Sequence, residues 1–295
     1  MRKAVLAAFI MFAVCGMVFA GGKADVGFTI STLNNPFFVS MKDGAEAKAK
    51  ALGVNLAVTD AGNDPAKQVK DIEDLVNKGI KVLIVNPVDS AAVAPAIKEV
   101  MNKGVKIIAV DRSVDGVTVD TYIGTNNLLA ANKAGKYFVQ LVKPGAVIAV
   151  LEGVPSTSSN IDRVGGYKQA LDEAGLTIAI MQTANYNRAE ALTVTENILQ
   201  SNPNITAIIA MNDEMALGAI EAVRAKGKTP GKDILITGFD AGDDAVAAVK
   251  AGEMIYTVEQ KPVLMGETAV DTAKKYIDGA SVQAVIPVDV EIVVK

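Results

Sequence analysis

The sequence lacks histidine entirely and contains a single cysteine among its 295 residues. Without histidine, the chain cannot form a Ser–His–Asp triad, a histidine–zinc site or a phosphohistidine relay. The one cysteine, Cys15, excludes a disulfide within the chain and a cysteine-rich zinc site. Cys15 also has no histidine in the chain to activate it as a nucleophile, the usual arrangement in cysteine-dependent enzymes. These two absences exclude many classes of enzyme.

The chain has no excess of positive charge either. Lys and Arg total 29 and Asp and Glu total 33, so the formal net charge is −4. This balance excludes a strongly basic nucleic-acid-binding protein. Half of the residues are hydrophobic and 21% are charged, which is typical of a globular rather than a disordered chain. At about 150 residues per domain, the length indicates about two domains.

The first twenty residues differ from the rest of the chain. Arg2 and Lys3 precede an apolar run over residues 4–14, and residues 18–20 place small side chains at the two positions that a signal peptidase inspects. The apolar run is too short to span a bilayer, so we predict a secretory signal peptide over residues 1–20. Cleavage would also remove Cys15. Because valine precedes Cys15, the lipoprotein motif is poor, and lipid attachment at Cys15 is the alternative to plain export.

After Lys23 the chain alternates between short apolar runs and helical segments. We expect strands at residues 26–30, 54–58, 82–85 and 105–110, each apolar enough to be buried on both faces. The pattern resumes with strands at 146–151, 177–181, 207–211 and 234–238. A helix is predicted at 36–52, ending at Gly53, and another begins at Asp64-Pro65 as N-cap and N1. The alternation predicts an α/β protein with parallel sheets in two halves, divided near residues 124–126.

Polar and aromatic side chains follow most of these strands. Ligands of open parallel sheets bind beyond the carboxyl ends of the strands. The segments at these ends are Ser31 to Phe38, Asn86 to Asp89, Asp111-Arg112, Glu152 to Arg163, Asn185-Tyr186, Asn212 to Glu214 and Asp240. They supply amides, carboxylates, arginines and aromatic rings, which hydrogen-bond hydroxyl groups and stack on the apolar faces of sugars.

Each feature also has a purely structural interpretation. Asn35 is a suitable N-cap for the helix that begins at Pro36. Phe37 and Phe38 are adjacent in that helix and cannot both face inward, so at least one needs another environment. Asp111 and Arg112 would also suit a surface ion pair.

The second half of the chain offers similar structural alternatives. We expect Asp213 to cap the helix over residues 215–226, which leaves Asn212 as the freer side chain. Asp240 would suit a turn. Residues 60–64 lack the ligand order and terminal glutamate of an EF-hand, so we predict a turn there and no metal site.

From Val26 to the C-terminus, the sequence resembles periplasmic sugar-binding proteins of the ribose-binding type. The segments 31–38 and 212–219 carry the resemblance, and 86–87, 111–112 and 238–240 support it. It implies two similar doubly wound parallel-sheet lobes joined by a hinge of three crossings, the type I periplasmic binding protein fold. The crossings would lie near Thr125, Gln260 and Asp289. The N-terminal lobe would then comprise residues 24–125 plus 261–289, and the C-terminal lobe 126–260 plus 290–295.

The resemblance also implies a ligand site between the lobes. Its residues would be Ser31, Asn35, Phe37, Phe38, Asp111 and Arg112 from the N-terminal lobe, and Arg163, Tyr186, Asn212, Asp240 and Gln260 from the C-terminal side and hinge. Ribose binders carry phenylalanine where this sequence has Tyr186, which keeps the stacking face and adds a hydroxyl. The segment Gly124-Thr125-Asn126 replaces the family's Ser-Asp-Asn, and Ala241 replaces a glycine.

By this resemblance, the protein is a non-enzymatic, exported, monomeric binding protein without cofactor or metal. It would capture a monosaccharide, D-ribose first, and deliver it to the permease of an ABC-type importer, with a chemoreceptor as a further partner. The alternatives are another sugar or a furanoside signal, and the core of a sugar-responsive repressor, which shares the architecture. A nucleotide-dependent dehydrogenase is disfavoured because no G-x-G-x-x-G follows the first strand.

Overall fold

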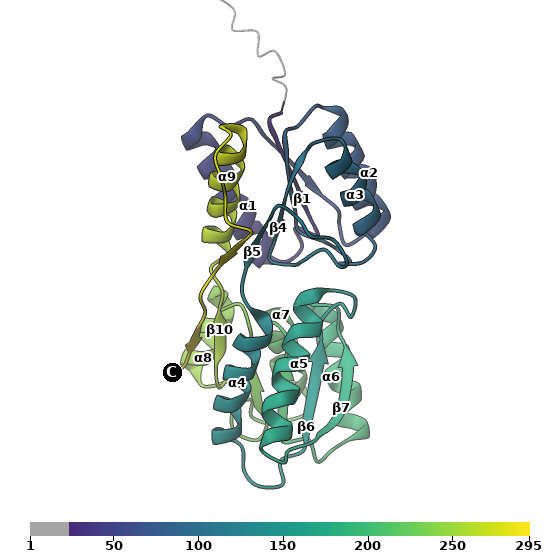
Figure 1. Ribbon diagram of the computed structural model, residues 1–295. Helices are drawn as coiled ribbons and strands as arrows, with labels where there is room; N and C mark the ends of the chain where they lie inside the picture. Colours follow the sequence, from purple (N-terminus) through teal and green to yellow (C-terminus); the bar gives the residue numbers. More distant parts are fainter. Residues whose placement is uncertain (1–23) are drawn as a thin grey trace, which may run out of the picture.

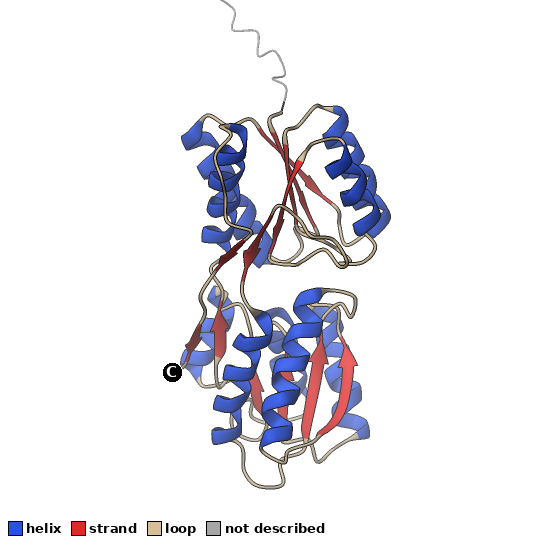
Figure 2. Cartoon of the chain, viewed as in Figure 1, coloured by secondary structure: helices blue, strands red, loops and turns tan. Residues whose placement is uncertain are grey.

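The computed structural model describes residues 24–295, so the predicted signal peptide and Cys15 lie outside the described residues. The chain forms two lobes, one above the other in Figure 1, each with a sheet between layers of helices. In Figure 2 the strands lie between the helices in both lobes.

The N-terminal lobe is built on a six-stranded parallel sheet. Its strands are β1 (Val26–Ile30), β2 (Leu56–Asp60), β3 (Val82–Val85), β4 (Lys106–Val110), β5 (Thr121–Gly124) and β11 (Val285–Pro287). They lie in the order β11-β5-β4-β3-β1-β2. Helices α1 (Pro36–Leu52) and α9 (Pro262–Ile277) pack on one face, and α2 (Pro65–Asn77) and α3 (Ala94–Asn102) on the other (Figure 1).

The C-terminal lobe repeats this order. Its strands are β6 (Ile148–Glu152), β7 (Ile178–Thr183), β8 (Ala207–Ala210), β9 (Leu235–Thr237), β10 (Thr257–Glu259) and β12 (Glu291–Val293). Four of them form a parallel sheet in the order β7-β6-β8-β9, and bridges at Thr237–Tyr256 and Asp240–Glu259 place β10 beside it. The helices are α4 (Asn127–Leu141), α5 (Ser158–Glu173), α6 (Arg188–Ser201), α7 (Asp213–Ala225) and α8 (Asp243–Ala251).

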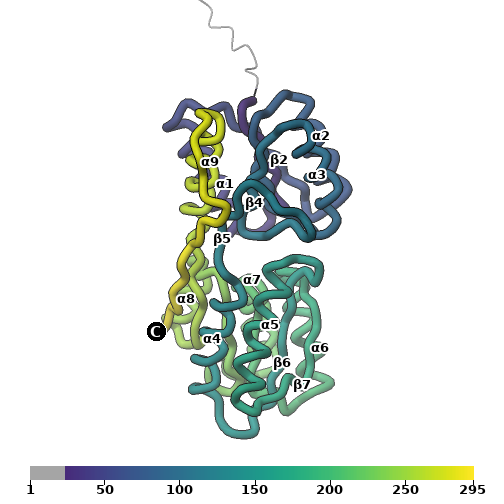
Figure 3. The backbone as a smooth tube through the Cα atoms, viewed as in Figure 1, coloured from purple at the N-terminus to yellow at the C-terminus, as the bar shows by residue number. Residues whose placement is uncertain are grey.

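The chain passes between the lobes three times. It crosses from β5 to α4, from β10 to α9, and from β11 to β12, and Figure 3 shows these passages on the same side of the molecule. The third passage explains why β12 pairs antiparallel with β10. The other C-terminal-lobe strands run toward the cleft, whereas β12 enters from the cleft and runs away from it.

Local sequence signals account for much of this structure. Helix α1 begins at Pro36 as predicted, and Gly53 ends it in the left-handed region with φ 65°. Asp64 caps α2 by accepting from two backbone N–H groups. Strands β1 and β3 are buried as predicted, but β2 starts two residues later than expected and is only half-buried. The burial prediction is wrong there because β2 is an edge strand.

Candidate functional site

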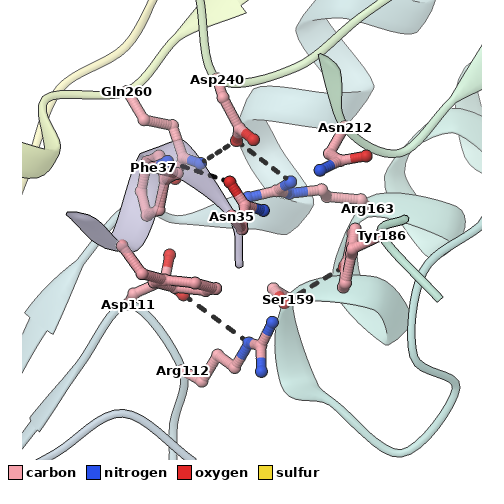
Figure 4. A pocket seen from close by; sticks show the side chains of 11 residues that line it. Asn35, Phe37, Asp111, Arg112, Ser159, Arg163, Tyr186, Asn212, Asp240 and Gln260 are labelled. Carbon is pink, nitrogen blue, oxygen red and sulfur yellow. Dashed lines mark hydrogen bonds and ion pairs between the residues drawn. The ribbon is translucent and has the colours of Figure 1, made fainter. Parts of the chain in front are cut away.

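The carboxyl ends of the parallel strands in both lobes face one another across a cleft. In each sheet the chain reverses its strand order at one point, beside β1 in the first lobe and beside β6 in the second. Such a switch point leaves a crevice between the loops that leave the strands. A small cavity of about 10 Å³ lies there, lined by Asn35, Phe37, Phe38, Asp111, Arg112, Ser159, Arg163, Tyr186, Asn212, Asp240 and Gln260. Figure 4 shows these side chains pointing toward one another from both lobes.

The start of α1 supplies an amide and two aromatic rings. Asn35 is the N-cap: its Oδ1 accepts from the Phe37 N–H at 2.9 Å, which leaves the Nδ2 group for the cavity. Phe37 and Phe38 are both buried, with ring centroids 5.3 Å apart and planes at 85°. The sequence predicts that at least one of these rings lies outside the core of the lobe. Both rings line the cavity, which provides that other environment. Asn35 is therefore both the N-cap of α1 and a residue of the cavity wall.

Asp111 and Arg112 follow β4 and are buried rather than forming a surface pair. The Arg112 Nε lies 3.7 Å from Asp111 Oδ2, and an Arg112 terminal nitrogen donates to the Pro87 carbonyl at 2.8 Å. The Arg112 guanidinium also lies 5.1 Å from the ring centre of Phe38 and 5.5 Å from that of Tyr186. Since those rings belong to different lobes, Arg112 joins the two lobes through cation–π contacts.

Ser31 lies behind this wall and does not line the cavity. Its backbone N–H donates to Asn86 Oδ1 at 3.2 Å, and Asn86 Nδ2 donates to Asp111 Oδ2 at 3.2 Å. Asn86 therefore links the first strand end to the Asp111 carboxylate. The Ser31 hydroxyl itself is buried and has no hydrogen-bond partner among residues 24–295.

Arg163 is the corresponding arginine of the C-terminal lobe. Its guanidinium donates from Nε to Asn127 and from a terminal nitrogen to the Met211 carbonyl, at 2.8 and 2.7 Å. It stacks on Phe239 at 3.9 Å and lies 3.6 Å from Asp240 Oδ1. These contacts fix the guanidinium beside the cavity.

Asp240 and Gln260 lie next to Arg163, at the hinge side of the cavity. Gln260 Nε2 donates to Asp240 Oδ1 at 2.7 Å (Figure 4). Gln260 lies between β10 and α9, directly at one of the three crossings. A hinge movement would therefore move Gln260 relative to the N-terminal lobe, to which the next helix, α9, belongs.

The roles predicted for Asn212 and Asp213 are reversed. Asn212 is the N-cap of α7, and its Oδ1 accepts from the Met215 N–H at 3.0 Å. Asp213 is the first helical residue, and its carboxylate accepts from Thr257 Oγ1 at 2.6 Å and from the Gly242 N–H at 2.8 Å. The prediction that Asp213 is the cap is therefore wrong, because its carboxylate is held by the neighbouring strand and loop. Asn212 still presents its Nδ2 group to the cavity.

Ser159 is a cavity residue that the sequence interpretation did not single out. It lies on α5 one helical turn before Arg163, so both side chains lie on the same face of the helix. Its hydroxyl is 3.2 Å from the Tyr186 hydroxyl. The spacing of four residues from Arg163 was the available signal.

Four buried polar atoms of the cavity have no hydrogen-bond partner within the described part of the chain. They are Asp111 Oδ1, Arg112 Nε, Asn212 Nδ2 and Gln260 Oε1. Buried polar groups are nearly always paired, because leaving one unpaired costs about 1–3 kcal/mol. The four comprise two acceptors and two donors, a set that suits a ligand carrying several hydroxyl groups.

Burial also shifts the ionisation of the charged groups. It raises the pKa of the Asp111 carboxyl, which the positive charges of Arg112 and Arg163 oppose. It raises the pKa of Asp240 well above its usual value, against the effect of Arg163, and it lowers the pKa of Arg112. The closed cleft therefore holds its charges at a desolvation cost, which hydrogen bonds from a ligand would offset.

Three cavity residues have an unusual backbone. Asp111, Tyr186 and Asp240 have φ values of 64°, 58° and 126°, in the region that favours glycine. Strained backbone of this kind concentrates at functional sites. Two of the three are aspartates, which adopt this region more often than most residues do, but residue type alone did not predict it at these positions.

Direct hydrogen bonds hold the lobes together at the cleft. The Ser90 N–H donates to the Ser156 carbonyl at 3.2 Å, and the Ser158 N–H donates to Ser90 Oγ at 3.1 Å. The Ser113 N–H donates to Ser158 Oγ at 2.9 Å. The structure therefore represents a closed arrangement of the two lobes.

Comparison with known proteins agrees with this architecture. The family model for the periplasmic binding protein domain matches residues 26–281. This chain belongs to that family.

The relatives include ribose import binding proteins. Those of Haemophilus influenzae and Escherichia coli are 41% and 38% identical to this chain, covering 93% and 94% of it and 92% of each relative. A solved Caulobacter myo-inositol binding protein, bound to myo-inositol, is 37% identical with a TM-score of 0.88, covering 95% of this chain and 96% of that one. A solute-binding protein of an ABC transporter from Actinobacillus succinogenes, with bound D-allose, is 32% identical with a TM-score of 0.85, covering 92% and 98%. Within residues 24–295, no helix is both long and apolar enough to cross a membrane.

Proposed function

We propose that this protein is an exported solute-binding protein that captures a monosaccharide, D-ribose first, between its lobes and delivers it to the permease of an ABC-type importer. The observation that carries the proposal is a set of four buried polar atoms around one small cavity that have no hydrogen-bond partner within residues 24–295; they belong to Asp111, Arg112, Asn212 and Gln260. Ribose offers hydroxyls that both donate and accept, and its ring has faces on which Phe37, Phe38 and Tyr186 can stack. The curated relatives named for ribose import support the same sugar.

The mechanism follows from the position of the binding groups in both lobes. A ligand that touches Asp111 and Arg112 on one side and Arg163 and Asp240 on the other makes its full set of contacts only when the lobes are closed. Closure is then favoured by the difference in ligand affinity between the two arrangements. Hinge closure around a ligand is the motion characteristic of periplasmic binding proteins.

The further parts of the proposal concern processing and organisation. Residues 1–20 act as a signal peptide, with lipid attachment at Cys15 as the alternative, and the mature protein is periplasmic and monomeric. The lobes comprise residues 24–125 plus 261–289 and residues 126–260 plus 290–295. A chemoreceptor is a further partner of the closed form, and binding involves no catalysis, metal, cofactor or nucleic acid.

A second ligand class is a cyclic polyol or an aldohexose. Tyr186, a residue of the cavity wall, carries a hydroxyl that phenylalanine lacks, and solved relatives hold myo-inositol and D-allose. A sugar-responsive repressor core would share the fold but act in the cytosol, so cell fractionation distinguishes the two classes.

The test is thermal denaturation of the mature protein against ribose, allose, myo-inositol and furanosides. A ligand at 100 times its Kd stabilises the folded state by about 2.7 kcal/mol. For a protein of this size, that raises Tm by about 5–10 °C. A shift with ribose at low concentration supports the proposal. A shift with another sugar alone refutes the choice of ribose, and no shift with any sugar refutes the function.

A further inference from the structure

Three hydroxyl groups form a short chain that ends at the ligand cavity. Thr157 Oγ1 donates to the Val154 carbonyl at 2.8 Å, and Ser159 Oγ donates to Thr157 Oγ1 at 3.5 Å. Ser159 Oγ lies 3.2 Å from the hydroxyl of Tyr186, a residue of the cavity wall. Thr157, Ser159 and Tyr186 are all buried, with exposed fractions of 0%, 2% and 9%. Water therefore competes little for these hydroxyls.

The hydrogen-bond partners favour one direction along this chain. Each hydroxyl has one proton to donate. The proton of Thr157 goes to the Val154 carbonyl, which can only accept, so Thr157 accepts from Ser159. Thr157 also accepts from the Asn160 N–H at 3.4 Å as the N-cap of α5. In the Ser159–Tyr186 pair either oxygen can donate; with the Ser159 proton directed to Thr157, Ser159 accepts from Tyr186.

The ring of Tyr186 has little freedom to rotate away from this arrangement. It lies against the backbone of Gly153 on one side, and the Arg112 guanidinium lies 5.5 Å from its centre. The position of the Tyr186 oxygen is thus set by packing, and the direction of its O–H bond by Ser159.

We propose that Tyr186 presents only a hydrogen-bond acceptor to the ligand, and that Ser159, through Thr157, is the positioning residue that fixes this polarity. The site then selects a sugar or polyol with a free hydroxyl donor beside Tyr186. It disfavours ligands that place an ether oxygen, a fluorine or another acceptor there. This inference rests on the proposed function and specifies the ligand chemistry of the same site.

The experiment compares fluorine with hydrogen at each ligand position. Calorimetric titration uses the best sugar of the thermal panel with its monodeoxy and monofluoro analogues. Fluorine accepts weakly but cannot donate, so at the position facing Tyr186 it should bind at least about threefold more weakly than hydrogen in the wild type. The readout is the Kd of the fluoro analogue divided by that of the deoxy analogue, so direct effects of fluorine on the sugar cancel between variants.

Two variants distinguish the hydrogen-bond polarity of the Tyr186 hydroxyl from the shape of its ring. Tyr186→Phe removes the acceptor, so affinity for the parent sugar falls by about fivefold, the scale of one hydrogen bond, and the fluoro-to-deoxy ratio at that position approaches that of the other positions. Ser159→Ala frees the Tyr186 proton, so the ratio falls below the wild-type value while the ring stays in place. Ser201→Ala is the matched control, because Ser201 is exposed and bonds only within and beside its own helix.

The outcomes distinguish this inference from the proposed function. Normal sugar binding with a ratio unchanged by Ser159→Ala, in a variant whose melting curve shows it folded, overturns the inference alone. A wild type that prefers fluorine at the Tyr186 position also overturns it. If another polyol binds and ribose does not, the choice of ribose is refuted. The fluoro-to-deoxy ratio measured with that polyol then tests whether Tyr186 acts as an acceptor. A protein that binds no sugar in the panel overturns both.

Discussion

The ring of Tyr186 lies directly on the backbone of Gly153, so closely that a Cβ atom at Gly153 would overlap the ring carbons. Gly153 follows β6 and Tyr186 follows the neighbouring strand β7, so the contact joins two strand ends on the cavity side of the sheet. The absence of a side chain at Gly153 determines how far the aromatic ring sits back from the cavity.

Gly153→Ala is therefore expected to push the Tyr186 ring into the cavity. Tyr186 forms part of the cavity wall, so a shift of its ring narrows the space in which the ligand would lie. We expect sugar affinity to fall by at least about tenfold, equivalent to about 1.4 kcal/mol. Calorimetric titration measures the effect. Gly165→Ala on α5 is the control, because its nearest neighbour is at an ordinary 3.4 Å, and equal losses in both variants would contradict the argument.

Asp111→Ala is expected to remove useful binding without unfolding the protein. The variant loses about two charge-assisted hydrogen bonds and leaves Arg112 poorly compensated, at a cost of about 3–5 kcal/mol. That corresponds to a weakening of about 10²–10⁴-fold. Ligand-free Tm should change little, because the open cleft is hydrated.

Titration and a ligand-free melting curve test both parts of the Asp111 prediction. Asp43→Ala, on the exposed side of α1, is the control with the same change of charge. Near-normal affinity of Asp111→Ala would show that its carboxylate is not a ligand contact. A collapse of the ligand-free Tm would make its role structural.

Ser90→Ala is expected to shift the lobes toward the open arrangement. It removes the acceptor of the Ser158 N–H, a bond that exists only when the lobes are closed. One such bond contributes about 0.5–1.5 kcal/mol, so affinity should fall by about 2–10-fold. Small-angle scattering should show a larger radius of gyration for the ligand-free variant and an unchanged radius at saturation. Identical ligand-free radii for Ser90→Ala, wild type and Ser201→Ala would refute this role.

Asp213 is expected to make stability fall as the pH rises. Burial raises the pKa of its carboxyl to about 6, above the usual 3.8 of an unfolded chain. Between these values the folded state binds the extra proton, so the contribution of Asp213 to stability decreases from about pH 4 to pH 6 and stays low above it. Asp213→Asn removes this titration.

Denaturant unfolding of both proteins at two pH values tests the Asp213 prediction. Relative to Asp213→Asn, the wild type should lose about 1 kcal/mol of unfolding free energy between about pH 5 and pH 7.5. Parallel pH profiles for the two proteins would show that Asp213 does not titrate in this range. The comparison is made without ligand, because the contacts of Asp213 lie within one lobe.

Sequence patterns predicted the architecture and most of the cavity wall because both depend on strand ends. A residue that follows a parallel strand is placed by the sheet, so the segments that contain Asn35, Asp111 and Tyr186 could be located without coordinates, and the family resemblance then selected these individual residues. The assignment of cap and ligand roles between Asn212 and Asp213 failed, because it depends on Thr257 and Gly242, which are distant in sequence. The positive φ values at Asp111, Tyr186 and Asp240 also depend on tertiary contacts, which residue type alone does not reveal.

The three connections between the lobes have a thermodynamic consequence. β11 pairs with β5 and β12 pairs with β10, so the connectors are hydrogen-bonded neighbours rather than independent linkers. Adjacent connectors of this kind oppose twisting and sliding and leave rotation about one axis as the easy movement. Closure then removes few degrees of freedom and little conformational entropy. More of the free energy of the ligand contacts is therefore available as affinity.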